Sequence, residues 1–196
     1  MYKNFFKRII DFVVSLIGLV LLSPIFLLIA ITVKLDSKGP VFFRQKRVGI
    51  HKTYFNILKF RTMRTDTPDV PTHLLKDPDV FITRSGKILR KTSLDELPQI
   101  VNILIGQMSI IGPRPALWNQ KDLIVERDKY SANDIYPGLT GLAQISGRDE
   151  LSIKEKSKSD GEYVQLLSFS EDVKIFFGTI MSVLKSDGIK EGKSDD

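Results

Sequence analysis

Two adjacent carboxylates, Asp95 and Glu96, stand in the stretch TSLDELPQ, directly after a basic segment. Acidic and cationic side chains in this combination suit a phosphorylated substrate, because carboxylates are ligands for Mg²⁺ and guanidinium groups hold phosphate oxygens. Ser93 and Glu96 also fit a capping box that would begin a helix over residues 94–105 and end it at Gly106. The sequence therefore permits a helix start, a catalytic acid pair, or both, and Asp95 is the residue that capping does not need.

The charge of the chain is concentrated in its first third. Residues 1–64 hold 12 Lys and Arg against two acids, whereas the remaining residues hold 17 basic and 21 acidic groups. A basic surface of this kind indicates an anionic partner, which can be nucleic acid, lipid headgroups or a phosphorylated substrate. The chain has no cysteine, which excludes a disulfide framework and a thiolate metal site.

Residues 12–33 form an uncharged, apolar run that is long enough to cross a membrane. A cleaved signal peptide fits the basic start, but the run is long for one and no A-x-A-like cleavage site follows it. A straight spanning helix and a re-entrant helix are the other two interpretations, and the spanning helix fits the length. Ser23 and Pro24 lie at its middle, where proline removes one backbone hydrogen bond and bends a helix. Both flanks are basic, so the positive-inside rule predicts that both ends remain cytoplasmic. We therefore expect a re-entrant helix with a break at Ser23-Pro24. The flanking cations are Lys3, Lys7, Arg8, Lys34, Lys38, Arg44, Lys46 and Arg47.

The remaining sequence predicts an α+β fold that is mainly helical. Residues 41–49 and 52–60 read as two strands of a hairpin, residues 65–80 as a proline-rich loop and residues 163–184 as one amphipathic helix. We expect a re-entrant membrane helix over 1–36, a cytosolic, membrane-associated catalytic domain with surface amphipathic helices over 37–188, and a flexible tail over 189–196. Nucleic-acid binding is disfavoured, because the cations adjoin a membrane-length segment and no nucleic-acid motif is present.

Several motifs, taken in order, give the sequence a recognisable pattern. Ser23-Pro24 is followed by FFRQKRVG, LKFRTM, ITRSGKILRKTSLDELPQIVNILIGQMSIIGPRP, PGLTGLAQISGR and DGEYVQLLSFSEDVKIFFGT. In this order and spacing they resemble the monotopic phosphoglycosyl transferases of the bacterial sugar transferase family, in its small form. The resemblance covers nearly the whole chain.

The resemblance implies a reaction at the cytoplasmic face of a bacterial membrane. Such enzymes move a sugar-1-phosphate from a UDP-sugar to polyprenol (undecaprenyl) phosphate and release UMP, which starts the assembly of a surface glycan or glycoprotein. The resemblance also implies that Asp95 is the nucleophile and that Glu96, the next residue, is the second catalytic acid. It implies that the same two carboxylates hold Mg²⁺. Membrane lipids and downstream glycosyltransferases are the other implied partners. A catalytically silent membrane scaffold for glycan-assembly enzymes is the alternative, but it would not need the acid pair.

Six further residues are predicted to bind substrate. A diphosphate resists an anionic nucleophile unless cations neutralise it, so Arg90 and Arg114 are predicted to contact its phosphates. The resemblance adds four positions around the donor site, which are Lys59, Arg61, Gln144 and Arg148.

Two positions depart from the family pattern. Gln107 stands where the family usually has an acid, and Tyr136 replaces an arginine before Pro-Gly. An amide carries no charge, so a metal-binding role is not expected at Gln107.

Overall fold

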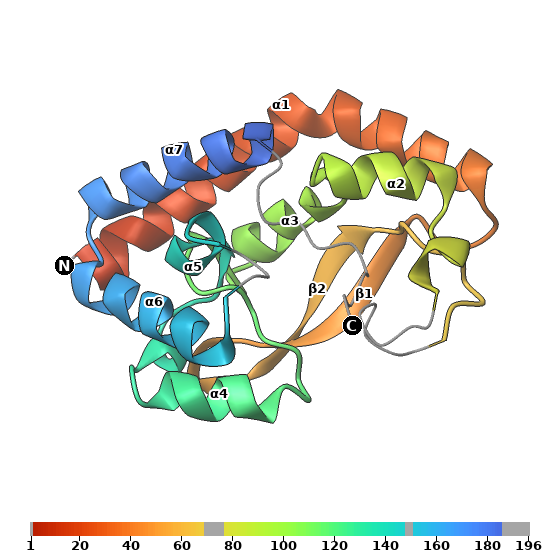
Figure 1. Ribbon diagram of the computed structural model, residues 1–196. Helices are drawn as coiled ribbons and strands as arrows, with labels where there is room; N and C mark the ends of the chain where they lie inside the picture. Colours follow the sequence, from red (N-terminus) through yellow and green to blue (C-terminus); the bar gives the residue numbers. More distant parts are fainter. Residues whose placement is uncertain (1, 69–76, 148–150, 186–196) are drawn as a thin grey trace.

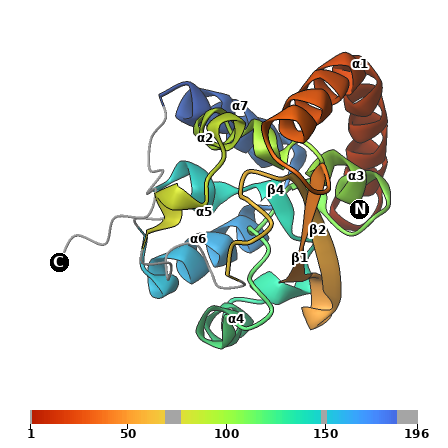
Figure 2. The ribbon, with the colours of Figure 1, turned by 90° about the vertical axis from the view of Figure 1, so that its right-hand side faces the viewer.

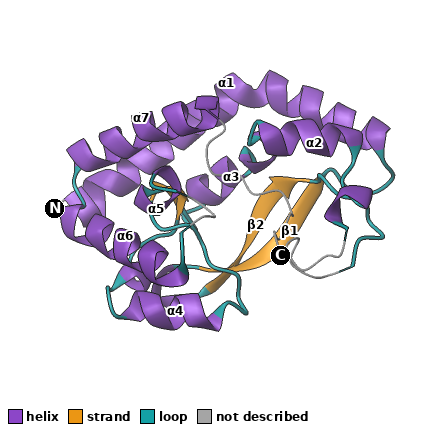
Figure 3. Ribbon diagram, in the orientation of Figure 1, coloured by secondary structure: helices purple, strands orange, loops and turns teal. Residues whose placement is uncertain are grey.

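The computed structural model describes residues 2–68, 77–147 and 151–185. It confirms a mainly helical α+β fold, in which one long helix, α1 (Lys7–Asp36), extends along one side of the shorter elements (Figures 1 and 3). The short helices are α2 (Arg84–Lys91), α3 (Gln99–Leu104), α4 (Lys121–Asp128) and α5 (Leu142–Ile145).

Helix α1 has the length and composition of a membrane helix. Its most apolar window has a mean hydropathy of 2.8, and only 11% of that window is buried inside the molecule. The helix is continuous through Pro24 but follows a bent path (Figures 1 and 2). The Ser23 hydroxyl donates to the Val20 carbonyl over 2.8 Å. Pro24 has no N–H to offer that carbonyl, so Ser23 satisfies it in place of the missing helix bond.

The predicted hairpin is confirmed as β1 (Phe42–Val48) and β2 (Tyr54–Phe60), which pair antiparallel from Phe42 opposite Phe60 to Val48 opposite Tyr54. Phe60 is buried between α1 and the hairpin, with its ring 5.4 Å from that of Phe42 and 5.5 Å from that of Phe26. The hairpin therefore packs against the C-terminal half of α1.

A second sheet was not expected from the sequence. It consists of two short parallel strands, β3 (Ser109–Ile111) and β4 (Gly138–Thr140). The chain segments approach so closely beyond β3 that a Cβ atom on Gly138 would lie 2.1 Å from the backbone nitrogen of Gly112. Glycine is needed there because the two backbones touch.

The predicted helix over residues 163–184 is wrong in its extent, because two helices occupy this region. They are α6 (Ile153–Leu166) and α7 (Phe169–Lys185). Leu167 leaves the helical conformation, and the Ser168 hydroxyl accepts a hydrogen bond from the Glu171 N–H in the first turn of α7. This local cap restarts the helix in a new direction.

Helix α7 is amphipathic but turns many of its large apolar side chains outward. The exposed ones are Phe169, Val173, Phe176, Phe177, Ile180 and Met181. Helix α7 meets α1 at the start of α1, where Lys7 Nζ lies 2.6 Å from Asp172 Oδ2. Such a surface suits contact with lipid, in line with the predicted surface amphipathic helices. The predicted tail, and residues 69–76 of the predicted loop, lie outside the described residues.

Candidate active site

The acid pair lies in a 3₁₀ turn, Leu94–Glu96, between α2 and α3. Ser93 precedes this turn with a left-handed backbone (φ 55°), and its side chain does not cap it. The predicted capping box is therefore wrong. The expected helix start at residue 94 is also wrong, because α3 begins at Gln99 after Pro98.

The C-terminal end of α3 does match the sequence. Gly106 has a positive φ of 85°. Its N–H donates to the Ile103 carbonyl over 3.0 Å, and the Gln107 N–H donates to the Asn102 carbonyl over 2.9 Å. These are the two hydrogen bonds of a Schellman motif, so Gly106 ends the helix as predicted.

Glu96 is held by two cations that come from distant parts of the chain. Lys59 Nζ on β2 lies 2.7 Å from Glu96 Oε1, and both terminal nitrogens of Arg114 donate to the same carboxylate. Burial alone would raise the pKa of Glu96, but the charges and hydrogen bonds of Arg114 and Lys59 hold that pKa well below its usual range. Glu96 is therefore an anion at any physiological pH.

Asp95 lies in a different environment, although it is the next residue. It is 8% exposed, and Lys59 Nζ is 4.0 Å from its Oδ2 atom. Burial raises the pKa of Asp95, and the positive charge of Lys59 offsets only part of that rise. The site thus contains one well-compensated carboxylate and one more basic carboxylate, which is how neighbouring acids acquire different roles.

Arg90 completes the cationic surroundings of the pair. Arg90 projects from α2, and its Nε donates to the hydroxyl of Thr62, which follows β2, over 3.0 Å. The positive charge of Arg90 lowers the pKa of Asp95. The structure therefore brings Arg90, Lys59 and Arg114 together around the acid pair.

The other predicted substrate-binding residues are placed differently. The Arg61 guanidinium donates to the carbonyls of Val33, Ser37 and Lys38 at the C-terminal end of α1. Its side chain thus fastens α1 to the end of β2. A donor-binding role for Arg61 stays a prediction without support from this geometry.

Among the residues that the structure describes, no hydrogen bond or ion pair joins Gln144 to the acid pair. Gln144 is buried on α5, and neither of its amide atoms has a hydrogen-bond partner among the described residues. A buried amide of this kind is available to a ligand. Arg148 lies outside the described residues.

Sequence reasoning missed Arg47 as a residue of the site. From the sequence it counts only as one of the flanking charges of the membrane segment. In the structure its Nη1 donates to the Pro115 carbonyl over 2.9 Å. Burial and the nearby charge of Arg114 lower the pKa of Arg47 to about 10, whereas Glu96 acts to raise it. The only sequence signal is that Arg47 stands in one of the family-like motifs, FFRQKRVG.

The two departures from the family pattern have structural partners. The Gln107 side-chain oxygen accepts a hydrogen bond from Asn102 over 2.7 Å. The guanidinium of Arg8 lies 4.1 Å from the centre of the Tyr136 ring, a favourable cation–π distance. Both side chains therefore stabilise the packing around the site.

The residues present fit Mg²⁺ only as an ion shared with a substrate. No cluster of three or more His, Cys, Asp or Glu suited to a metal occurs in the described part of the chain. Mg²⁺ commonly takes one or two protein carboxylates and completes its shell with water and substrate phosphates. Asp95 and Glu96 could supply such a pair, although Lys59 and Arg114 already occupy the oxygens of Glu96.

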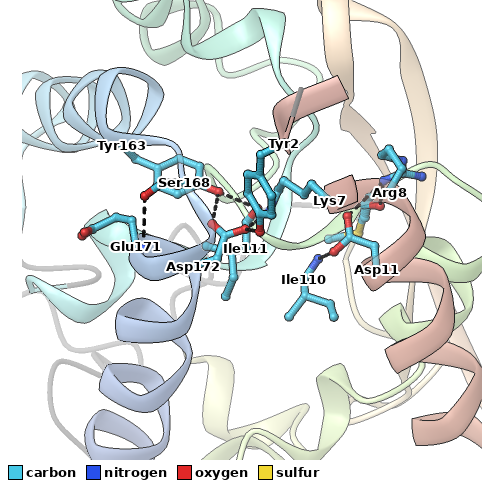
Figure 4. Close-up of polar contacts among 11 residues, drawn as sticks. Tyr2, Lys7, Arg8, Asp11, Ile110, Ile111, Tyr163, Ser168, Glu171 and Asp172 are labelled. Carbon is cyan, nitrogen blue, oxygen red and sulfur yellow. Dashed lines mark hydrogen bonds and ion pairs between the residues drawn. The ribbon is translucent and has the colours of Figure 1, made fainter. Parts of the chain in front are cut away.

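A buried polar cluster fixes the start of α1 (Figure 4). Asp172 on α7 accepts hydrogen bonds from Lys7 and from Tyr163, each over 2.6 Å. Asp11 accepts from the Ile110 N–H over 3.0 Å, and Arg8 donates to the Met108 carbonyl over 2.8 Å. Helix α1 is therefore bound directly to the segment that leads into the loop of Arg114.

Comparison with known proteins yields several relatives of high similarity. An uncharacterized sugar transferase, EpsL, of Bacillus subtilis is 41% identical over 94% of this chain and 90% of its own length. A UDP-glucose:undecaprenyl-phosphate glucose-1-phosphate transferase of Caulobacter vibrioides is 41% identical over 92% of this chain and 70% of its own length. A protein of the same name from Klebsiella pneumoniae is 43% identical over 89% of this chain but only 39% of its own length.

A family model gives the same assignment. The model described as bacterial sugar transferase matches residues 2–186, a range that includes α1, the acid pair and α7. The resemblance expected from the motifs is thereby confirmed, and the chain is an enzyme that belongs to the bacterial sugar transferase family.

Proposed function

We propose that the protein transfers a sugar-1-phosphate from a UDP-sugar to a polyprenol phosphate through a covalent intermediate on Asp95. The observation that carries this proposal is the contrast between the two carboxylates. Glu96 is neutralised by Lys59 and Arg114, whereas burial makes Asp95 the more basic of the pair. A basic carboxylate surrounded by phosphate-binding cations suits a nucleophile that attacks phosphorus.

In the first step, a carboxylate oxygen of Asp95 attacks the phosphorus that bears the sugar. A bond forms between that oxygen and phosphorus, and the bond from phosphorus to the bridging oxygen of the diphosphate breaks. UMP leaves with the bridging oxygen and its electron pair. Arg90 and Arg114 stabilise the negative charge that develops on the phosphate oxygens.

In the second step, a phosphate oxygen of the polyprenol phosphate attacks the same phosphorus. The bond to Asp95 breaks, its carboxylate is regenerated, and a polyprenol diphosphate sugar is formed. Covalent capture divides one transfer into two, so that a water-soluble donor and a membrane-bound acceptor can use the same site in turn.

Mg²⁺ would be held by Asp95 and Glu96 together with the donor phosphates, and when bound it would neutralise part of the diphosphate charge. The chelator EDTA is therefore expected to abolish turnover, and excess Mg²⁺ to restore it. The measurement is UMP release in chelator-treated buffer, with or without added Mg²⁺. Full turnover in chelator would remove the metal from the proposal.

The names of two relatives supply the first donor and acceptor to test. The Caulobacter and Klebsiella proteins are named as UDP-glucose:undecaprenyl-phosphate glucose-1-phosphate transferases. We expect UMP release when the purified protein receives a suitable UDP-sugar with undecaprenyl phosphate. A panel that begins with UDP-glucose and includes N-acetylated sugars identifies the donor. Failure of every donor would favour the silent scaffold.

We also propose that α1 is re-entrant, with both ends on the cytoplasmic side. Its first turns bind the catalytic part through Lys7 and Asp172. Its last residue, Asp36, accepts hydrogen bonds from the Ser85 N–H and hydroxyl. A straight helix of this length would extend about 45 Å, more than the hydrocarbon core of a bilayer. If such a helix crossed the membrane, its two ends would lie on opposite sides. Contacts between both ends and the same compact unit support a helix that enters and leaves by one face.

Cysteine labelling tests this topology, because the chain has no cysteine of its own. We expect Lys3→Cys and Lys38→Cys to react equally with an impermeant maleimide applied from the cytoplasmic side in inverted vesicles. The control is the same pair in right-side-out vesicles, where neither is expected to react. Labelling of the two positions from opposite sides would establish a spanning helix.

A further inference from the structure

Hydrogen bonds fix the backbone of the loop that carries Arg114 at four successive residues, from Gly112 to Pro115. The first two involve β4, since the Gly112 N–H donates to the Thr140 carbonyl over 2.8 Å, and the Gly138 N–H donates to the Pro113 carbonyl over 2.9 Å. The fixed dihedral angles of Pro113 and Pro115 restrict the chain on either side of Arg114. The backbone of this loop is therefore held with little freedom.

The other two backbone groups are held by the side chains of two arginines, of which Arg127 is buried and Arg47 is partly buried. Arg127 Nη1 donates to the carbonyl of Arg114 itself over 2.9 Å. Arg47 Nη1 donates to the carbonyl of Pro115, also over 2.9 Å. Arg47 belongs to β1 and Arg127 to α4, so two separate elements grip adjacent carbonyls. We call these two side chains the carbonyl clamp.

Arg127 is held in turn by Asp160 on α6. Its Nε and Nη2 atoms lie 2.8 Å and 2.6 Å from Asp160 Oδ2, and the side chains of Arg127 and Asp160 are only 6% and 1% exposed. A buried ion pair contributes little net stability, since desolvation of both charges offsets their attraction. Net stability alone therefore does not explain why an ion pair lies at this position. Arg127 has a second role, because it also donates a hydrogen bond to the Arg114 carbonyl.

We propose that Arg127, oriented by Asp160, is a positioning residue that sets Arg114 against the Glu96 carboxylate, with Arg47 as the second member of the clamp. This inference rests on the proposed function, in which Arg114 contacts the donor phosphates. The Arg114 side chain is 43% exposed, so its own packing does not fix it. A displacement of the loop by about 1 Å would move the guanidinium away from its productive place and slow the reaction by about 100-fold.

The variant Arg127→Lys tests the clamp with little change in charge. A lysine keeps a positive charge beside Asp160, but its single ammonium does not reproduce the planar fork that serves Asp160 and the Arg114 carbonyl together. We expect kcat to fall about 10- to 100-fold. The melting temperature in detergent is measured alongside, because the variant also loses buried hydrogen bonds to Asp160 and to the Arg114 carbonyl. The control is Lys129→Gln, which removes an exposed ion pair with Glu126 next to the same helix and is expected to leave kcat unchanged.

A double-mutant cycle separates positioning from a general structural effect. In the background of Arg114→Ala there is no guanidinium left to position, so Arg127→Lys is expected to lower kcat by less than about twofold. Losses that multiply in the double variant would overturn the proposal. Should Arg127→Lys fail to fold, Arg47→Lys is measured in the same cycle, because Arg47 holds the neighbouring carbonyl.

Hydrogen exchange tests the clamp without any activity. Peptides that cover residues 109–117 and 136–141 are expected to exchange faster in Arg127→Lys, whereas those of α2 and α3 are unchanged. Unchanged exchange in the first two segments would overturn the proposal. Hydrogen exchange also distinguishes failure of the clamp from failure of the proposed function. A protein that turns over no UDP-sugar refutes the proposed function, whereas the exchange experiment tests the clamp without any turnover.

Discussion

Asp95→Asn is expected to remain folded and to turn over more than about 1,000-fold more slowly than the wild type. An amide is nearly the same size as a carboxylate but is a far poorer nucleophile toward phosphorus. Burial raises the pKa of Asp95, so folding does not depend on a strong ion pair of this carboxylate. The loss is therefore expected in the chemistry and not in stability.

The covalent intermediate can be observed directly. Wild-type enzyme mixed with the UDP-sugar alone is expected to release about one UMP per active site, because the first step needs no acceptor. Intact-mass analysis of the same mixture is expected to show the protein with one added sugar-phosphate. Asp95→Asn is expected to show neither the early UMP nor the mass increase.

An exposed acid provides the matched control. Asp79 lies on the surface in the 3₁₀ turn Pro78–Val80, and Asp79→Asn is expected to behave as the wild type in turnover, early UMP and mass. Normal turnover of the wild type without early UMP or a mass increase would indicate direct transfer between bound donor and acceptor. Asp95 would then act as a base or a metal ligand.

The elements of the fold that depend on local pattern were predictable from the sequence. The hairpin, the end of α3 at Gly106 and the apolar α1 follow from alternation, glycine chemistry and length. The capping box failed because a tertiary contact replaced a local one. Glu96 could have bonded the backbone three residues earlier, but Lys59 and Arg114 offer charged partners from 37 and 18 residues away, and such hydrogen bonds are stronger.

The remaining features depend on contacts between distant segments. The strands β3 and β4 have three residues each, too few to show a periodic pattern. Lys59 and Arg61 stand two residues apart in LKFRTM, but Lys59 reaches Glu96, whereas Arg61 turns to the free carbonyls at the end of α1. Nothing local distinguishes the two side chains. In the sequence, Arg47 and Arg127 likewise resemble ordinary surface cations, and only the fold shows that each holds a carbonyl of the Arg114 loop.

Glu96→Gln is expected to lower turnover by about 100-fold or more while leaving the nucleophile in place. Glutamine has the shape of glutamate, but it lacks the charge that holds Lys59 and Arg114. Lys59 also lies 4.0 Å from Asp95, so without Glu96 its charge is expected to act on Asp95 alone and make that carboxylate a weaker nucleophile.

The difference in stability between the wild type and Glu96→Gln is expected to depend on pH. The pKa of Glu96 is held well below its usual range in the folded protein, so the ionised form stabilises the fold above that range. This contribution is lost as the pH falls through the folded pKa. We expect the free energy of unfolding of Glu96→Gln to be about 2 kcal/mol lower than that of the wild type at pH 7. The two proteins are expected to converge in acid.

The two acid variants are distinguished by the covalent intermediate. Because Asp95 is intact in Glu96→Gln, the sugar-phosphate adduct is expected to accumulate on this variant during long incubation with the UDP-sugar, at a rate that matches its reduced turnover. Asp95→Asn is expected to show no adduct at any time. If Glu96→Gln never forms an adduct while Asp95→Asn does, the roles of the two carboxylates must be exchanged, and Glu96 becomes the nucleophile.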